Sequence, residues 1–225
     1  TGEVEARLEV NDRIAVGTLD LVADEIILNA KDVPLHGDLE VHANLAEGNL
    51  PTKEFDLSGT TIRLDNMVGH ELSERKQEKL DPWFCDVELQ SGQVIFGKPM
   101  SAEGRVGLTM YDTRPIVAML KNLETGPKWL SMMPNVKDVD GTVDMDFGKG
   151  RMAVDDIDLT GTKFKALGWF SSQNKKADAR LFIKHGILAA GIALDQGKAK
   201  VHLAKPRKWF EEQQSLPAGN VEQAR

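Results

Sequence analysis

The sequence contains 225 residues, of which 41% are hydrophobic and 28% are charged, and it carries a formal net charge of −7. These proportions are normal for a folded soluble protein and argue against a disordered or membrane-spanning chain. The negative charge argues against a nucleic-acid partner, because phosphate contacts need a concentrated lysine and arginine surface. The length suits one large β domain or two smaller domains.

Three further features bear on the compartment. No apolar run approaches the roughly 18 to 20 residues of a membrane helix, and nothing at the N-terminus resembles a signal peptide. Thr1 already lies inside an alternating pattern, so we expect a processed product or an excised fragment. Cys85 is the single cysteine, which excludes an internal disulfide and leaves both the cytosol and the periplasm open.

The N-terminal part of the chain predicts the opening strands of a meander. In Gly2–Val10 apolar residues alternate with charged ones, and the same alternation returns within 19–28 and 37–45. Val33–Pro34 predicts a break between these strands. Alternation with a period of two indicates strands with one buried face.

The next segment is the first copy of an internal repeat. KEFDLSGTTIR at Lys53–Arg63 returns as DDIDLTGTKFK at Asp155–Lys165, and from Gly48 onward the register holds for sixteen positions at a constant offset of 102 residues (150 − 48). Apolar residues occupy every second position on both sides of the shared glycine. Because glycine adopts positive φ without steric cost, each copy predicts a strand, a sharp bend and a second strand.

Two segments predict helices. Residues 69–81 are strongly charged and predict a short surface helix or an ordered loop. Residues 112–133 predict the amphipathic helix of the chain, with Asp112 and Thr113 as a capping pair and Pro115 in the first turn. Its apolar stripe must face another part of the protein.

Short turns of the form polar-Gly-polar follow several alternating strands, at Gly48, Gly92, Gly150 and Gly197. Such turns are typical of hairpins, and their irregular spacing excludes a propeller or a strict solenoid. Strand signals continue to about residue 203. The pattern therefore predicts a mainly β protein built as a long antiparallel meander.

The predicted organisation is one elongated β domain over residues 1–210. It contains two related halves, with 37–68 resembling 141–170, and a helical insert near 112–133. Residues 211–225, rich in polar residues, are expected to form a loose C-terminal tail.

Motifs that carry chemistry are few. Asp138–Asp146 suggests a calcium loop, but its glycine is fourth rather than sixth and Lys149 stands where the loop needs glutamate, so a turn and a strand are favoured. The five histidines show no metal spacing, and no GxSxG, Walker or GxGxxG motif occurs. We therefore expect no enzyme activity, no metal and no cofactor.

The segment Lys205–Phe210 allows two interpretations. Its basic and aromatic residues either bind an anionic head group at a membrane surface or end the last strand, with Trp209 and Phe210 sealing the core. We favour the packing interpretation, because aromatic side chains in proteins mostly contribute to the hydrophobic core.

Together the strands, the glycine bends and three phrases resemble the AsmA-like proteins, a group of bridge-like lipid-transfer proteins of the Gram-negative envelope. The phrases are FDLSGTTIRLDN at 55–66, DIDLTGTKFKALG at 156–168 and DTRPIVAMLKNLETGPKWL at 112–130. The resemblance implies a curled antiparallel sheet, described as a β-groove or β-taco, with an apolar concave face. It also implies a periplasmic protein, anchored in the inner membrane by a segment outside this chain.

The resemblance gives the alternating apolar positions a function. It implies that they line a groove that binds phospholipid or another acyl-chain lipid, conveys it or assists outer-membrane biogenesis, without catalysis. The candidate groove residues are Leu57, Ile62, Leu64, Val143, Met145, Phe147, Leu159, Phe164 and Leu181.

A closed sandwich or barrel predicts the same alternation, with the apolar side chains meeting one another instead of lipid. The alternative function is therefore a protein-interaction or scaffold domain with a closed core, whose edge strands pair with a protein partner.

Overall fold

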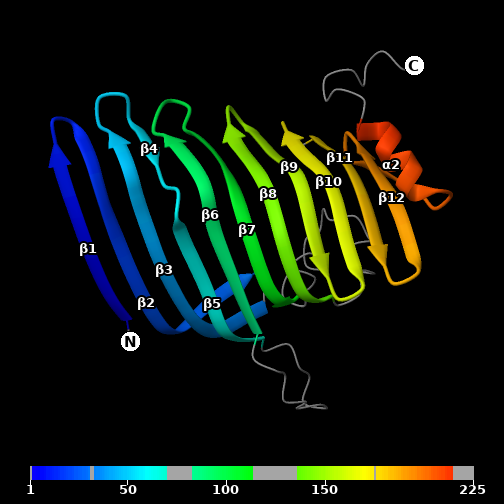
Figure 1. The fold of residues 1–225 in the computed structure, drawn as a ribbon, viewed down its shortest axis with the longest axis horizontal. Helices are drawn as coiled ribbons and strands as arrows, with labels where there is room; N and C mark the ends of the chain where they lie inside the picture. Colours follow the sequence, from blue (N-terminus) through cyan, green and yellow to red (C-terminus); the bar gives the residue numbers. More distant parts are fainter. Residues whose placement is uncertain (1, 31–32, 70–82, 114–135, 175, 215–225) are drawn as a thin grey trace.

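A computed structural model of the chain describes residues 2–30, 33–69, 83–113, 136–174 and 176–214. These residues form one 13-stranded antiparallel sheet and one short helix (Figure 1), which confirms the predicted mainly β meander. The elements are β1 (Gly2–Asn11), β2 (Ile14–Ala30), β3 (Val33–Asn49), β4 (Glu54–Asp56), β5 (Thr60–Gly69), β6 (Trp83–Ile95), β7 (Ser101–Asp112), β8 (Lys137–Gly148), β9 (Arg151–Gly161), β10 (Phe164–Gln173), β11 (Lys176–His185), β12 (Leu188–Asp195), β13 (Lys198–His202) and α2 (Pro206–Gln214).

Strand order in the sheet follows the chain, with one irregularity. β4 and β5 both pair with β3 on one side and with β6 on the other, so together they form one interrupted strand. β1 and β13 are the two ends of the strand order. The described residues therefore form an open sheet rather than a closed sandwich or barrel.

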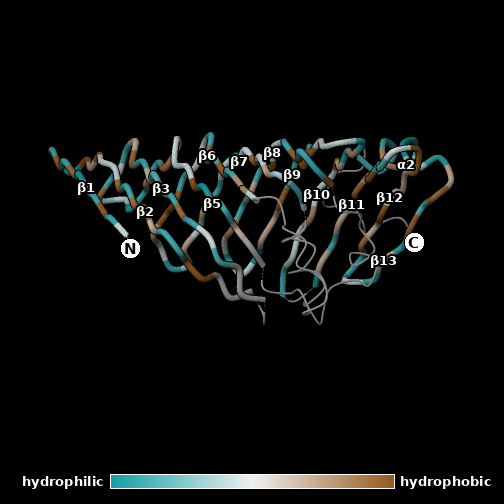
Figure 2. The backbone as a smooth tube through the Cα atoms, turned by 90° about the horizontal axis from the view of Figure 1, so that it is seen from below, coloured by the Kyte–Doolittle hydropathy of each residue, from teal (hydrophilic) through white to brown (hydrophobic). Residues whose placement is uncertain are grey.

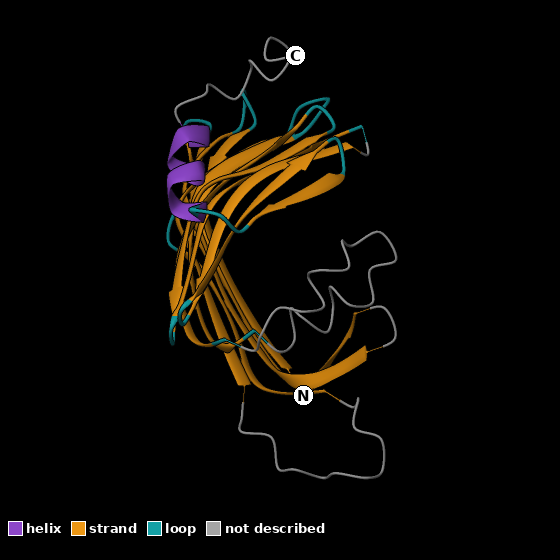
Figure 3. Ribbon diagram, turned by 90° about the vertical axis from the view of Figure 1, so that its right-hand side faces the viewer, coloured by secondary structure: helices purple, strands orange, loops and turns teal. Residues whose placement is uncertain are grey.

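The sheet is strongly curved, and Figure 3 shows it as a C in cross-section with α2 on the convex side. The rings of Phe182 on β11 and Phe210 on α2 lie 6.1 Å apart, so Phe182 points to the convex face. Because successive side chains of a strand point to opposite faces, Leu181 and Ile183 point to the concave face. Figure 2 shows the alternation of hydrophobic and hydrophilic residues along the strands that produces these two faces.

A line of bulges bends the N-terminal strands together. Glu25 and Asn66 have positive φ angles of 57° and 54°, at irregularities of register in β2 and β5. Between them Asp38 on β3 accepts a hydrogen bond from the side-chain amide of Asn66 at 2.8 Å and another from the backbone N–H of Glu25 at 3.2 Å. These two bonds hold the pKa of Asp38 below its ordinary value, and the bond from Asn66 has the larger effect. One carboxylate thus links the bends of three strands.

The two copies of the repeat fold differently. In the first copy the chain continues in one direction from β4 into β5, and Gly59 at the break has a φ of +84°. In the second copy the chain reverses between β9 and β10, which pair as a hairpin. Both copies contain the predicted strand, bend and strand, but only the second bend is a turn between neighbouring strands.

Side-chain partners distinguish the two bends. Asp56 accepts a hydrogen bond at 2.8 Å from the backbone N–H of Ser58, which curls the chain locally after β4. The equivalent residue of the second copy is Asp158, whose carboxylate instead lies 3.3 Å from the ammonium of Lys165 across the hairpin. The same aspartate therefore supports a local kink in one copy and cross-strand pairing in the other.

Two of the four predicted glycine turns are confirmed. Gly150 and Gly197 lie in the β8–β9 and β12–β13 turns with positive φ. The prediction is wrong for Gly48 and Gly92, which lie inside β3 and β6. There a Cβ at Gly48 would stand 2.8 Å from the ring of Phe55, so glycine makes room for a side chain rather than forming a turn.

Both predicted helices, 69–81 and 112–133, lie almost wholly outside the described residues. Asp112, expected as a helix cap, is instead the last residue of β7, opposite Lys137 of β8. Pro34, expected at a break, lies within β3 opposite Asn29 of β2. In both places cross-strand pairing extends the strand beyond the local sequence signal.

The position of α2 differs from the expectation of a strand end at Lys205–Phe210 followed by a loose tail from residue 211. Arg207 and Glu211 pair at 2.7 Å one helical turn apart, which stabilises a helix there. Gly191 on β12 leaves room for Trp209, since a Cβ at that position would stand 2.1 Å from the indole. Phe210 is only 1% exposed, as the packing interpretation of this segment expects.

We predict that Phe210→Ala lowers the free energy of unfolding by about 3 kcal/mol, because truncating a buried phenylalanine leaves a cavity. Urea denaturation followed by circular dichroism measures the change. Leu203→Ala is the control, since Leu203 is exposed and should change stability by less than about 0.5 kcal/mol. Equal stabilities for both variants would show that α2 does not pack on the sheet in solution.

Candidate functional site

An unbroken row of apolar residues crosses the concave face. Directly opposed residues of antiparallel strands share a face, so the register carries the concave orientation of Ile183 from strand to strand. The row runs from β1 to β12 through eleven strands, of which β5 represents the interrupted β4–β5 strand. Its members are Val4, Leu21, Val41, Ile62, Val87, Leu108, Gly141, Leu159, Ala166, Ile183 and Ala190.

A second row follows the same face near the upper edge of the sheet in Figure 1. Its members are Val10, Ala15, Gly48, Phe55, Val94, Ala102, Phe147, Met152, Ser172 and Ala177. Neither row contains an aspartate, glutamate, lysine or arginine. The concave face therefore offers a continuous uncharged surface across almost the whole sheet.

Eight of the nine groove candidates lie on this face. Ile62 and Leu159 belong to the first row and Phe147 to the second. Five others lie two or four residues away from members of these rows on the same strands, and so point to the same side: Leu64, Val143, Met145, Phe164 and Leu181. Leu57 lies between β4 and β5, outside the strands, and the register does not assign it a face.

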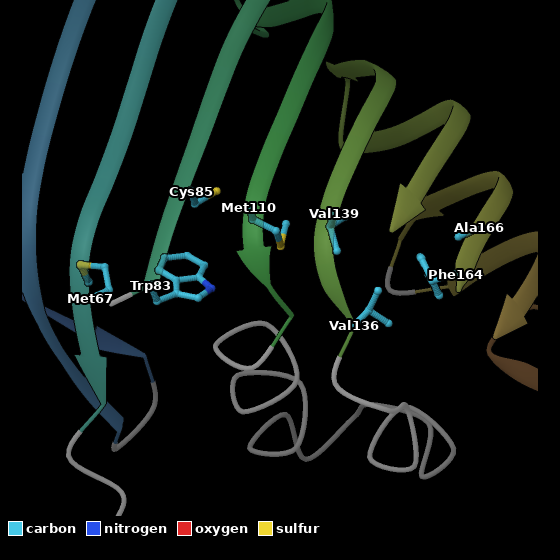
Figure 4. Packing of buried hydrophobic residues seen from close by; sticks show 8 residues of the cluster. All are labelled: Met67, Trp83, Cys85, Met110, Val136, Val139, Phe164 and Ala166. Atoms are coloured by element: carbon cyan, nitrogen blue, oxygen red, sulfur yellow. The ribbon is translucent and has the colours of Figure 1, made fainter. Parts of the chain in front are cut away.

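The lower part of the concave face contains a buried cluster (Figure 4). It comprises Met67, Trp83, Cys85, Met110, Val136, Val139, Phe164 and Ala166. The indole N–H of Trp83 donates a hydrogen bond at 2.7 Å to the backbone carbonyl of Asp112 and ties β6 to the end of β7. Of this cluster only Phe164 was among the predicted groove residues, although the alternation of Trp83, Cys85 and Val87 also indicates a strand with one apolar face.

Exposure of the face changes along the sheet. Met110 in the middle is 2% exposed, whereas Val4 on β1 is 67% exposed. Ile62 and Phe147 are each 38% exposed. Apolar side chains at these positions thus remain accessible to a ligand, while the cluster of Figure 4 is already packed.

The convex face is polar, and several of its charges are paired with one another. Arg105 on β7 lies 3.1 Å from the carboxylates of both Asp144 and Asp156. Arg63 on β5 lies 3.6 Å from Asp86 on β6. These cross-strand pairs are half exposed, so each contributes little stability, but they place the charges of the middle strands on the outside of the curve.

The calcium-like segment Asp138–Asp146 belongs to β8. Its Asp144 contacts Arg105, and Asp146 lies 3.7 Å from Arg151, so these carboxylates face guanidinium groups on the convex side. Within the described residues no group of three or more histidine, cysteine, aspartate or glutamate side chains is arranged to hold a metal ion. The segment forms the predicted strand, but the turn expected before that strand is absent from it, because β8 already begins at Lys137.

No protein-family model, curated protein or solved structure matches the chain. Of the helices among the described residues, none has the length and apolar character needed to cross a membrane.

Cys85 lies in the buried cluster, and its environment determines its reactivity. Burial, with a smaller contribution from the charge of Asp86, raises the pKa of the thiol to about 11. Thiolate is the reactive form, so at neutral pH this cysteine is a packed apolar side chain and a poor nucleophile.

We predict that Cys85 reacts slowly with iodoacetamide at neutral pH and that the rate keeps rising toward pH 11. The thiolate fraction sets this profile, because the raised pKa means that the neutral thiol persists through the range in which an ordinary cysteine ionises. Mass spectrometry of protein alkylated at a series of pH values measures the rates, with a free cysteine peptide as control. A plateau at the pH of the peptide would contradict the prediction.

Proposed function

We propose that the concave face binds the acyl chains of phospholipid or a related lipid, without catalysis. The observation that carries the proposal is the row of eleven uncharged residues from Val4 to Ala190, which crosses the sheet without interruption. Each methylene group removed from water against such a surface contributes about 0.8 kcal/mol. Charged side chains would oppose this transfer, and neither row contains one.

The dimensions of the face favour a track over a pocket for one chain. The first row crosses eleven strands, and at a strand spacing of about 4.8 Å it is roughly 50 Å long. One leaflet of the hydrocarbon core of a membrane is about 15 Å thick. Between Val87 and Ile183 the first row packs against the buried cluster, so acyl chains would lie along its exposed members near β1 and along the second row. The second row crosses ten strands and is suited to conveying lipid as well as holding it.

The resemblance of the two repeat copies to AsmA-like proteins supplies the proposed setting. In that setting the chain is a section of a periplasmic protein that is anchored in the inner membrane by another segment and assists outer-membrane biogenesis. The open curved sheet and its uncharged concave rows support this assignment.

Two neighbouring residues provide a matched test. Ile62 points to the concave face, whereas Thr61 next to it on β5 points to the convex face. We predict that Ile62→Lys lowers the lipid carried by the protein at least about tenfold, because it brings an ammonium group into the apolar row. Thr61→Lys adds the same charge on the other face and should leave the lipid unchanged.

The measurement is solvent extraction of protein purified without detergent, followed by mass spectrometry for phospholipid. Circular dichroism of both variants checks that the fold is intact. Stoichiometric lipid in the wild type that is lost only in Ile62→Lys supports the groove. Wild-type protein free of lipid, or equal losses in both variants, would contradict it.

A second candidate function rests on β1. This strand is an end of the sheet order, and all ten of its residues are exposed. Such an edge pairs with an added strand of a partner, and the chain would then act as a scaffold.

If this second function holds, Ala6→Pro should abolish binding of a protein partner, because proline removes a backbone donor and disturbs the strand. Pull-down followed by mass spectrometry compares the variant with the wild type. Partner binding that survives the substitution would exclude β1 as the docking strand.

A further inference from the structure

Along the upper edge of the sheet in Figure 1, each turn connects one strand to the next strand of the chain. We call the turns 12–13, 50–53, 96–100 and 149–150 the upper rim. They connect β1 to β2, β3 to β4, β6 to β7 and β8 to β9. The backbone N–H of Leu50 donates to the carbonyl of Arg13 at 3.0 Å, and that of Phe96 donates to the carbonyl of Lys53 at 2.9 Å. Beside the last two turns the ends of β7 and β8 pair, with Ser101 opposite Gly148. The upper rim is therefore a continuous lip beside the concave face.

Each turn of the upper rim carries one cation. These are Arg13, Lys53, Lys98 and Lys149, and the only carboxylate in the same turns is Asp12. The upper rim thus has a net charge of +3 (4 − 1), although the whole chain has −7. Positive charge is concentrated on one lip of an acidic protein.

These four cations are exposed, and none forms an ion pair with a described residue. Several cations of the convex face are instead paired. Arg63, Arg105 and Lys165 each pair with carboxylates at 3.1 to 3.3 Å. The cations of the upper rim therefore remain available to an external anion.

The same turns expose apolar side chains. Leu50, Phe96 and Met100 are 44%, 52% and 58% exposed. Phe96 also packs edge to face on Phe55 of the second concave row, with ring centroids 5.3 Å apart. Through this ring contact the apolar surface of the groove continues directly onto the upper rim.

The spacing of the cations identifies the kind of partner. Consecutive turns on one edge are two strands apart, so the four charges are about 10 Å from one another along a line. A single phosphate cannot contact charges so spaced, whereas a sheet of anionic head groups can. Cations combined with exposed leucine, phenylalanine and methionine are typical of surfaces that lie on the interface of an anionic membrane.

We propose that the upper rim docks on the surface of an anionic phospholipid bilayer, with Leu50, Phe96 and Met100 entering the interface between the cations. This docking deepens the proposed function, on which it rests, because it sets the concave face against the source or destination of its lipid. Acyl chains then pass between bilayer and groove beside Phe96 and Phe55 without crossing a charged side chain.

The test compares two double variants that change net charge equally. K53Q/K98Q removes two cations of the upper rim, and K163Q/K184Q removes two exposed lysines from the lower β9–β10 turn and the convex face. Neither pair loses a salt bridge to a described residue. Co-sedimentation is measured with vesicles of phosphatidylcholine alone and of phosphatidylcholine mixed with phosphatidylglycerol, at low and high salt.

We expect the wild type to bind the mixed vesicles and to release them at high salt, and K53Q/K98Q to bind them about tenfold or more weakly. K163Q/K184Q should bind like the wild type. L50S/M100S should weaken binding at both salt concentrations, because it removes the apolar contacts. Equal binding by the two lysine variants, or equal binding to neutral and anionic vesicles, would overturn the proposal.

The two proposals fail separately. If the groove binds lipid but the rim does not dock, Ile62→Lys loses its lipid while the lysine variants sediment alike. If the rim docks but the groove binds nothing, vesicle binding depends on Lys53 and Lys98 in a protein that carries no lipid.

Discussion

The structure depends on cross-strand register. Because side chains alternate with a period of two, a slip of one residue anywhere between β1 and β12 would move every later apolar side chain to the convex face. The pairing instead keeps Val4 in line with Ala190 across eleven strands. Where register shifts occur, as between Thr142 and Asp144, an extra residue in the partner strand restores the face. Bulges thus bend the sheet without mixing its two surfaces.

Curvature and charge reinforce this separation. The bends of β2, β3 and β5 meet at Asp38, whose carboxylate accepts hydrogen bonds from the backbone of Glu25 and the side chain of Asn66. On the convex side Arg105 and its two carboxylates link β7 to β8 and β9. α2 covers the convex face at β11 and β12, where Phe182 interrupts the polar pattern. The concave side is thereby left as the surface that no described helix or second sheet covers.

The apolar concave face and the basic upper rim have complementary roles in the proposed exchange of lipid with a membrane. Apolar surface holds acyl chains but gives no attraction at a distance, whereas the charges of the upper rim attract an anionic surface over about 10 Å at ordinary salt. Phe55 and Phe96 connect the two regions physically. The two proposals, lipid binding by the groove and membrane docking by the rim, use these two features together.

Alternation alone predicted that the chain is a β meander, and it predicted which apolar side chains share a face within a strand, such as Met145 and Phe147. Glycines were ambiguous: Gly150 forms a turn, whereas Gly92 makes room for the side chain of Leu89 inside a strand, and the local sequence is similar in both. The two copies of the repeat diverged because Asp56 bonds locally and Asp158 bonds across strands. Only the tertiary structure decided which face is concave, where α2 packs, and that Arg13, Lys53, Lys98 and Lys149 share an edge. The physical reason is that periodicity is a property of each strand, whereas the alignment of rows and turns arises from pairing between segments far apart in the chain.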